Sequence, residues 1–183
     1  MDPIRITTIP NSAVVGNPSI IHVTAQLSRV PGADVTLPIS EAMFSRIASA
    51  VDAAFALHNR TNGSTVSLIH GNMADRKLFA VSIYPARKIE LWTRPSWQEL
   101  FEFAKANLDL LLKPDHALGT WFDDYELIHC LDMVVLVRDL DDAVELGLRS
   151  DQVAIFDLEA RREIPIRRSR HGFNASLQAG GAR

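Results

Sequence analysis

Between positions 123 and 132 the chain holds its densest group of potentially reactive side chains, with Cys130 directly after His129. A cysteine and a histidine act as nucleophile and base only when they lie within hydrogen-bond reach and a third group orients the base. Side chains alternate along an extended strand, so Cys130 shares a face with Glu126 and Asp132, whereas His129 points to the opposite face. The pattern predicts a buried structural cysteine, and no catalytic residue can be assigned.

The histidines are scattered and lack the short spacings typical of metal sites. The six are His22, His58, His70, His116, His129 and His171. Asp115-His116 and Asp123-Asp124 could converge on a hard cation across a loop, but nothing in the pattern requires it. We therefore expect neither a metal ion nor another cofactor.

A ligand pocket is an alternative that the strand ends suggest. The turns that enter the expected helices contain no glycine, which argues against a phosphate-binding loop. Ligands of open sheets nevertheless gather beyond the carboxyl ends of parallel strands. Arg138, Asp139 and Asp157 occupy such positions, and Trp121 could line the same groove, so a small enzyme or ligand-binding domain would have its pocket there. Cys130 could contribute to it, and Asp139 also fits the simpler role of a helix N-cap.

The charge is unevenly distributed along the chain. Residues 109–163 contain fourteen acidic and five basic side chains, a charge of -9, against -3 for the whole chain. A carboxylate-rich surface favours encounter with a basic partner, whereas its simpler interpretation is a solvated surface. The carboxylates that we expect to bind a partner protein are Asp123, Asp124, Glu126, Asp141, Asp142 and Glu145.

The last segment, residues 167–183, is basic and has little to bury, so we expect a disordered tail. Arg167, Arg168 and Arg170 could contact phosphates, which makes weak nucleic-acid binding a further alternative. Residues 1–166 carry a charge of -7 and show no basic helix, so nucleic-acid binding by the body is not expected.

The single cysteine excludes an internal disulfide, and we find neither a signal peptide nor a run of about 18 apolar residues. We expect a soluble, cytoplasmic protein without a membrane segment. With 47% apolar residues, positions 1–166 can form one domain with its own core.

Hydrophobic periodicity predicts a mixed α+β fold. Helices are expected over 41–58, 96–112 and 139–149. Ser96 and Glu99 form a capping box at the start of the second helix. Strands are expected over 4–9, 19–27, 65–70, 77–84, 88–92, 118–122, 127–137, 152–158 and 163–166. The two apolar runs of residues 131–158 and the helix between them predict a β-α-β unit in an otherwise mostly antiparallel sheet.

A resemblance adds to these patterns. Gly119-Thr120-Trp121, Leu131-Asp132-Met133-Val134, Asp141 to Gly147 and Gln152 to Leu158 resemble the C-terminal part of small uncharacterised proteins of phages and related mobile elements, with a looser likeness around Phe79-Ala80-Val81-Ser82. The resemblance implies a genomic setting and a binding role, and brings no catalytic positions. Our leading hypothesis is a non-enzymatic protein-binding accessory factor, in its fullest form an inhibitor of a host nucleic-acid-targeting defence system.

Overall fold

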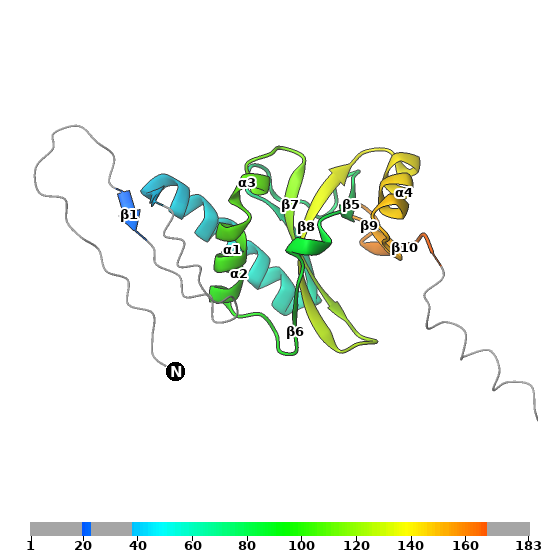
Figure 1. Cartoon of the computed structure of the whole chain (residues 1–183), viewed down its shortest axis with the longest axis horizontal. Coiled ribbons are helices and arrows are strands. Elements are labelled where there is room, and N and C mark those ends of the chain that lie inside the picture. The colour runs from blue at the N-terminus through cyan, green and yellow to red at the C-terminus, as the bar shows by residue number, and fades with distance from the viewer. Residues whose placement is uncertain (1–19, 23–37, 168–183) are drawn as a thin grey trace, which may run out of the picture.

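The computed structural model describes residues 20–22 and 38–167, which contain a curled sheet and the helices that pack on it (Figure 1). The expected strand over 4–9, most of that over 19–27, and the tail beyond Arg167 lie outside the described residues. The strands are β1 (Ile20–His22), β2 (Pro38–Ser40), β3 (Gly63–Ser67), β4 (Gly71–Asn72), β5 (Phe79–Ser82), β6 (Ile89–Leu91), β7 (His116–Asp123), β8 (Ile128–Val137), β9 (Ala154–Asp157) and β10 (Arg162–Pro165). The helices are α1 (Glu41–Thr61), α2 (Trp97–Ala106), α3 (Leu108–Leu111), α4 (Leu140–Arg149) and the 3-10 turn η1 (Pro85–Arg87). The α+β class is confirmed.

The main sheet has the order β10-β9-β5-β8-β7-β3-β4, and each neighbouring pair is antiparallel. Its centre is the β7–β8 hairpin, in which His116 pairs with Val135 and Asp123 with Ile128 without a register break. Residues 128–134 of β8 are all buried, as expected for a central strand that is covered on both faces. A separate two-stranded sheet joins β1 to β2.

β5 and β6 lie along the same edge of β8 and are separated by an excursion of the chain. Ser82 pairs with Val134, and Ile89 then pairs with Leu131, so residues 83–88 face only two residues of β8. The short turn η1 takes up the extra length. β6 is therefore a displaced continuation of β5.

Ser40 is the N-cap of α1, and its hydroxyl accepts from the N–H of Met43 at 3.2 Å. Asn62 is the C-cap of α1 and has the left-handed φ of 60° that terminates many helices. Its last turn extends beyond position 58, where the sequence pattern placed the end. The side chains that it buries recur at helical spacing and are Ile47, Val51, Ala54 and His58.

The capping box of Ser96 and Glu99 is present, because the Ser96 hydroxyl accepts from the Glu99 N–H while the Glu99 carboxylate accepts from the Ser96 N–H at 2.8 Å. One continuous helix over 96–112 is wrong, since the chain breaks at Asn107 into α2 and α3. The Asn107 amide donates to the Phe103 carbonyl at 2.8 Å, and its oxygen accepts from Arg87 at 3.0 Å. The side chain thus competes with the helical pattern, as asparagine commonly does.

Replacing Ser96 with alanine should lower the free energy of unfolding by about 1 kcal/mol, because the Glu99 N–H in the first turn loses the hydroxyl that accepts it. Chemical denaturation measures this. Ser45, exposed within α1, is the matched control, and its replacement with alanine should leave stability nearly unchanged. Equal effects at both positions would contradict the assigned cap.

The β-α-β unit has the expected order, β8, α4, β9, with one refinement. β8 and β9 run in the same direction but do not pair, because β5 lies between them and is antiparallel to both. Ala143 and Gly147 are the buried positions of α4. A Cβ at Gly147 would lie 2.6 Å from Ile166 and 3.0 Å from Ile155, so glycine permits this close approach.

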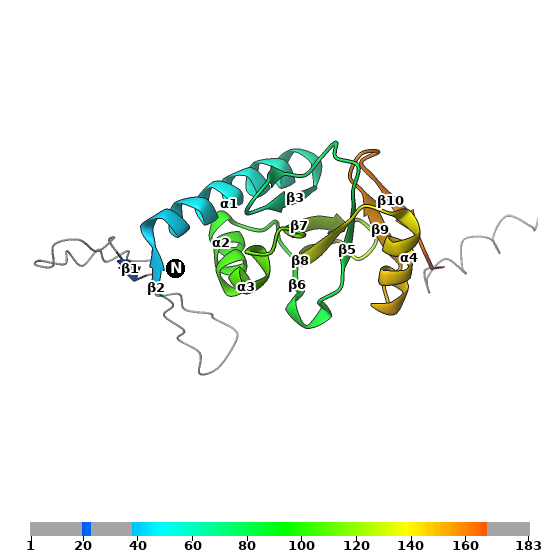
Figure 2. The same ribbon diagram turned by 90° about the horizontal axis from the view of Figure 1, so that it is seen from above.

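The α-helices of the described residues pack against one face of the sheet. In Figure 2, α1, α2 and α3 lie towards one side of the molecule, and α4 lies at the other side, near β9 and β10. Met133 of β8 packs with α1 and α2, and Val81 packs under α4. Val81 pairs with Val135, which shares a face of β8 with Met133. On the other face, the loop residues Met73 and Leu158 complete a smaller core.

Candidate functional site

The tip of the β7–β8 hairpin presents exposed apolar side chains among carboxylates. Asp123 fixes the turn, because its carboxylate accepts from the N–H groups of Tyr125 and Glu126 at 3.0 Å each. Leu127 follows with a left-handed φ of 56°. Tyr125 is 68% exposed and Leu127 is 63% exposed, although both are large enough to contribute to a core.

Trp92 lies at the same end of the sheet and is 81% exposed. It directly follows Leu91, the last residue of β6, which pairs with His129 near the start of β8 (Figure 1). We call this surface the hairpin end. It consists of Trp92, Asp123, Asp124, Tyr125, Glu126 and Leu127. Exposed tryptophan and tyrosine are the residues that most often dominate protein–protein binding energy.

The six carboxylates expected to form one acidic surface form two. Asp123, Asp124 and Glu126 belong to the turn that precedes β8, whereas Asp141, Asp142 and Glu145 belong to α4, which follows β8. A strand of this length separates the two groups by roughly 30 Å. Only the first group lies beside exposed aromatic side chains.

The expected pocket of Trp121, Arg138, Asp139 and Asp157 is not assembled. Trp121 pairs with Cys130, near the start of β8, whereas Arg138 follows the last residue of that strand. The Asp139 carboxylate accepts from the N–H groups of Asp141 and Asp142, which makes it the N-cap of α4. Asp157 accepts from the N–H groups of Glu159 and Ala160 and so fixes the turn after β9.

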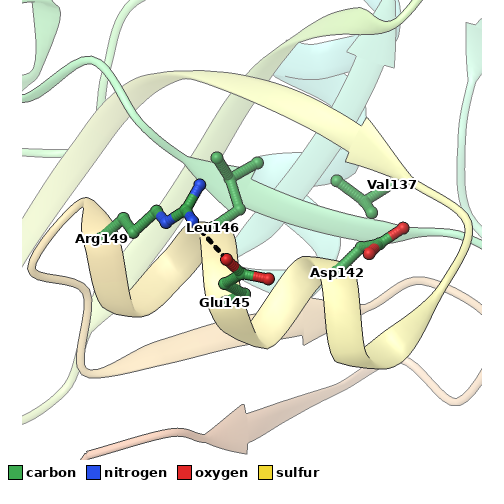
Figure 3. Close-up of a pocket in the computed structure, with 5 residues that line it drawn as sticks. All are labelled: Val137, Asp142, Glu145, Leu146 and Arg149. Atoms are coloured by element: carbon green, nitrogen blue, oxygen red, sulfur yellow. Dashed lines mark ion pairs between the residues drawn. The ribbon is translucent and has the colours of Figure 1, made fainter.

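A shallow hollow of about 260 Å³ lies on α4, close to where that pocket was expected (Figure 3). Its lining residues are Val137, Asp142, Glu145, Leu146 and Arg149. Glu145 and Arg149 form an ion pair of 2.5 Å across one helical turn, and both side chains are exposed. Such surface pairs contribute little energy and are common on solvated helices, so the hollow does not indicate a reaction.

Cys130 lies on the face opposite the helices and is fully buried. Burial raises the pKa of its thiol to about 11, although the Lys88 ammonium nearby partly opposes that shift. On the same face, the Asp132 carboxylate accepts from Trp121 Nε1 at 2.9 Å and from the Ser82 hydroxyl at 3.1 Å. Cys130 is therefore a neutral core thiol, and it does not pair with His129.

Because Cys130 is the only cysteine, thiol alkylation reports on it alone. We expect the native protein to react with iodoacetamide at pH 8 at least a hundredfold more slowly than the unfolded chain, since the thiol is protonated and enclosed. Mass spectrometry with and without denaturant measures the two rates. Similar rates in both conditions would show that the thiol is accessible and would reopen a role for it.

His129 instead belongs to a buried chain of polar groups that links the sheet to α1. His58 Nε2 lies 2.9 Å from His129 Nδ1, and His58 Nδ1 lies 2.9 Å from the Thr120 hydroxyl. The Thr120 hydroxyl also contacts the Ser64 hydroxyl at 2.8 Å. Burial, with smaller effects from His129 and Arg94, lowers the pKa of His58 to about 4. Burial also lowers the pKa of His129. Both shifts favour the neutral imidazoles at pH 7, and their contacts hold α1 on the sheet.

A second chain of contacts lies at the other end of β7. The Tyr84 hydroxyl is 2.7 Å from His116 Nε2, and His116 Nδ1 is 2.8 Å from the Asp115 carboxylate. Hydrogen bonding to His116 lowers the pKa of Asp115. This geometry resembles that of a general base and its orienting group, but none of its residues lines the hollow on α4. Sequence reasoning missed both chains because their members come from segments far apart in the sequence.

Of the three arginines considered for nucleic-acid binding, the structure describes only Arg167. Its guanidinium pairs with Asp151 and donates to the Leu148 carbonyl at 2.8 Å, so Arg167 is held against the end of α4. Arg168 and Arg170 lie outside the described residues. Within residues 20–22 and 38–167, no group of three or more His, Cys, Asp or Glu is arranged to hold a metal ion.

No protein-family model matches this sequence, and neither a curated protein nor a solved structure shows significant similarity to it. Among the described residues, no helix is long and apolar enough to cross a membrane. The fold and surface define the chain as an α+β domain with an exposed aromatic and acidic hairpin end. The resemblance to phage and mobile-element proteins stays a prediction.

Proposed function

We propose that this chain is a protein-binding factor without catalytic activity of its own, and that it binds its partner through the hairpin end. The observation that carries the proposal is the exposure of Trp92, Tyr125 and Leu127 at one end of the sheet. Burying side chains of this kind contributes roughly 1.5 to 3 kcal/mol each, and monomeric proteins seldom leave such side chains clustered in water.

The carboxylates of the hairpin end support a basic partner surface. Asp124 and Glu126 are exposed, and no ion pair within the described residues involves either of them. Unpaired charges at the rim of an apolar patch accelerate the encounter with an oppositely charged partner and disfavour other partners. An accessory factor of phage or mobile-element origin that inhibits a host nucleic-acid-targeting system would need such a surface, and we retain that role as the fuller form of the proposal.

The test is affinity capture from host cells with two charge-reversed variants. Asp124→Lys with Glu126→Lys alters the hairpin end, and Asp142→Lys with Glu145→Lys makes the same change on α4. We expect the α4 variant to retain a stoichiometric partner that the hairpin variant loses. Loss of that partner only in the α4 variant, or its retention by both variants, would contradict the proposed surface.

A further inference from the structure

One edge of β6 is unpaired among the described residues. β6 pairs with β8 along its other edge, from Ile89 opposite Leu131 to Leu91 opposite His129. β9 extends the sheet past β5, where it pairs with Phe79 and Ala80, but does not continue past β6. The excursion of residues 83–88 thus leaves β6 as a short open edge, whose free N–H and C=O groups are a template for another strand.

Two large apolar side chains at this edge are exposed. Ile89 is 40% exposed, and Trp92, which directly follows the last residue of β6, is 81% exposed. Three residues of backbone provide only a few hydrogen bonds, each with a modest net contribution. An added strand would therefore need the aromatic contact as well as the backbone pairing, and the two lie side by side.

The charges indicate which strand would fit. Lys88 forms an ion pair with Glu90 at 2.9 Å, and Arg94 donates to the carbonyls of His58 and Asn59 at the end of α1. Both cations are therefore occupied, while Asp124 and Glu126, in the turn between β7 and β8, are exposed. A second copy of this chain would bring the same carboxylates together, which disfavours self-association at this edge.

We propose that the open edge of β6 receives an extended, basic segment of the partner protein as an added strand, with an apolar side chain of that segment against Trp92. This inference rests on the proposed function and specifies how the hairpin end recognises its partner. Backbone pairing would set the register, and lysine or arginine side chains of the segment would face the hairpin carboxylates.

A titration of the full chain with peptides tests this inference. Binding is measured from the changes in the backbone amide chemical shifts of the chain. The probes are a short peptide of alternating lysine and valine, the same peptide with alternate backbone nitrogens methylated, and a glutamate–valine counterpart. We expect the first to shift the amides of residues 89–92 and 124–127. Methylation, which removes backbone donors but keeps the side chains, should weaken binding at least tenfold, and the acidic peptide should not bind.

Two variants show whether the peptide binds at Trp92 or at the carboxylates of α4. Trp92→Ala should weaken the lysine–valine peptide about tenfold, whereas Asp142→Lys with Glu145→Lys on α4 should leave its affinity unchanged. Equal affinity of the methylated and unmethylated peptides would overturn strand addition while leaving the hairpin end as a docking surface. Binding that shifts only amides distant from β6, or no binding at all, would also overturn strand addition. The proposed function is tested independently by affinity capture. It would be wrong if variants of the hairpin end retained the captured partner.

Discussion

Trp92→Ala is expected to weaken capture of the partner about thirtyfold or more while leaving the fold intact. Truncating a central tryptophan of an interface commonly costs 2 kcal/mol or more, and Trp92 has 81% of its surface available for such a contact. Because that side chain is not part of the core, we expect the free energy of unfolding to change by less than about 0.5 kcal/mol. Titration of the captured partner, together with chemical denaturation, measures both quantities.

Leu140→Ala provides the matched control for this prediction. Leu140 is also exposed, at 43%, but it lies on α4 rather than at the hairpin end. Its truncation should leave partner affinity unchanged. If Leu140→Ala and Trp92→Ala weakened the partner equally, the interface would extend to α4 and the hairpin end would not be its centre.

The second large effect is a loss of stability in mild acid. His58 is 1% exposed and has a pKa of about 4, against 6.5 for an unperturbed histidine. Below pH 6.5 the unfolded chain takes up a proton that the folded chain rejects, so protonation favours unfolding until the pH reaches about 4. The stability contributed by neutral His58 is therefore complete above pH 6.5, and about 3 kcal/mol of it is lost between pH 6.5 and 4.

Denaturation at a series of pH values tests this loss in the wild type and in His58→Gln. The variant should be about 1 to 3 kcal/mol less stable at pH 7, because the glutamine amide has both polar atoms at the end of the side chain and cannot replace Nδ1 and Nε2 together in the contacts with Thr120 and His129. Its stability should also fall less steeply below pH 6.5, with His129, whose pKa burial also lowers, accounting for part of the remaining slope. The exposed His70 is the control, and His70→Gln should behave like the wild type. Identical slopes for wild type and His58→Gln would refute the assignment.

Local sequence signals predicted most elements because each depends on neighbouring residues. The capping box at Ser96 and Glu99 and the alternation along β8 are patterns of this kind, and both are present in the structure. The break at Asn107 was not predictable in the same way. It depends on Arg87, twenty positions away in sequence, which donates to the asparagine side chain.

Strand order and side-chain clusters depend on contacts between distant segments, so the sequence alone determined them poorly. The two runs of the β-α-β unit were identified, but nothing local to them indicated that β5 would lie between β8 and β9. His58 and His129 are 71 positions apart and meet only because α1 crosses the sheet at β7 and β8.

The positions of the acidic residues in space also could not be predicted from the sequence. Composition predicted a carboxylate-rich C-terminal half, but a ten-residue strand divides those carboxylates between the hairpin end and α4. Trp92, Tyr125 and Leu127 were not singled out, because an aromatic or aliphatic residue beside a strand is usually buried. Their exposure became evident only once the register placed them beyond the ends of β6 and β7.

Hydrogen–deuterium exchange of the chain with and without its captured partner maps the binding surface along the backbone. We expect slower exchange of residues 89–93 and 123–128 in the complex, with the exchange of α4 unchanged. Protection confined to α4, residues 140–149, with unaltered exchange at the hairpin end, would contradict it.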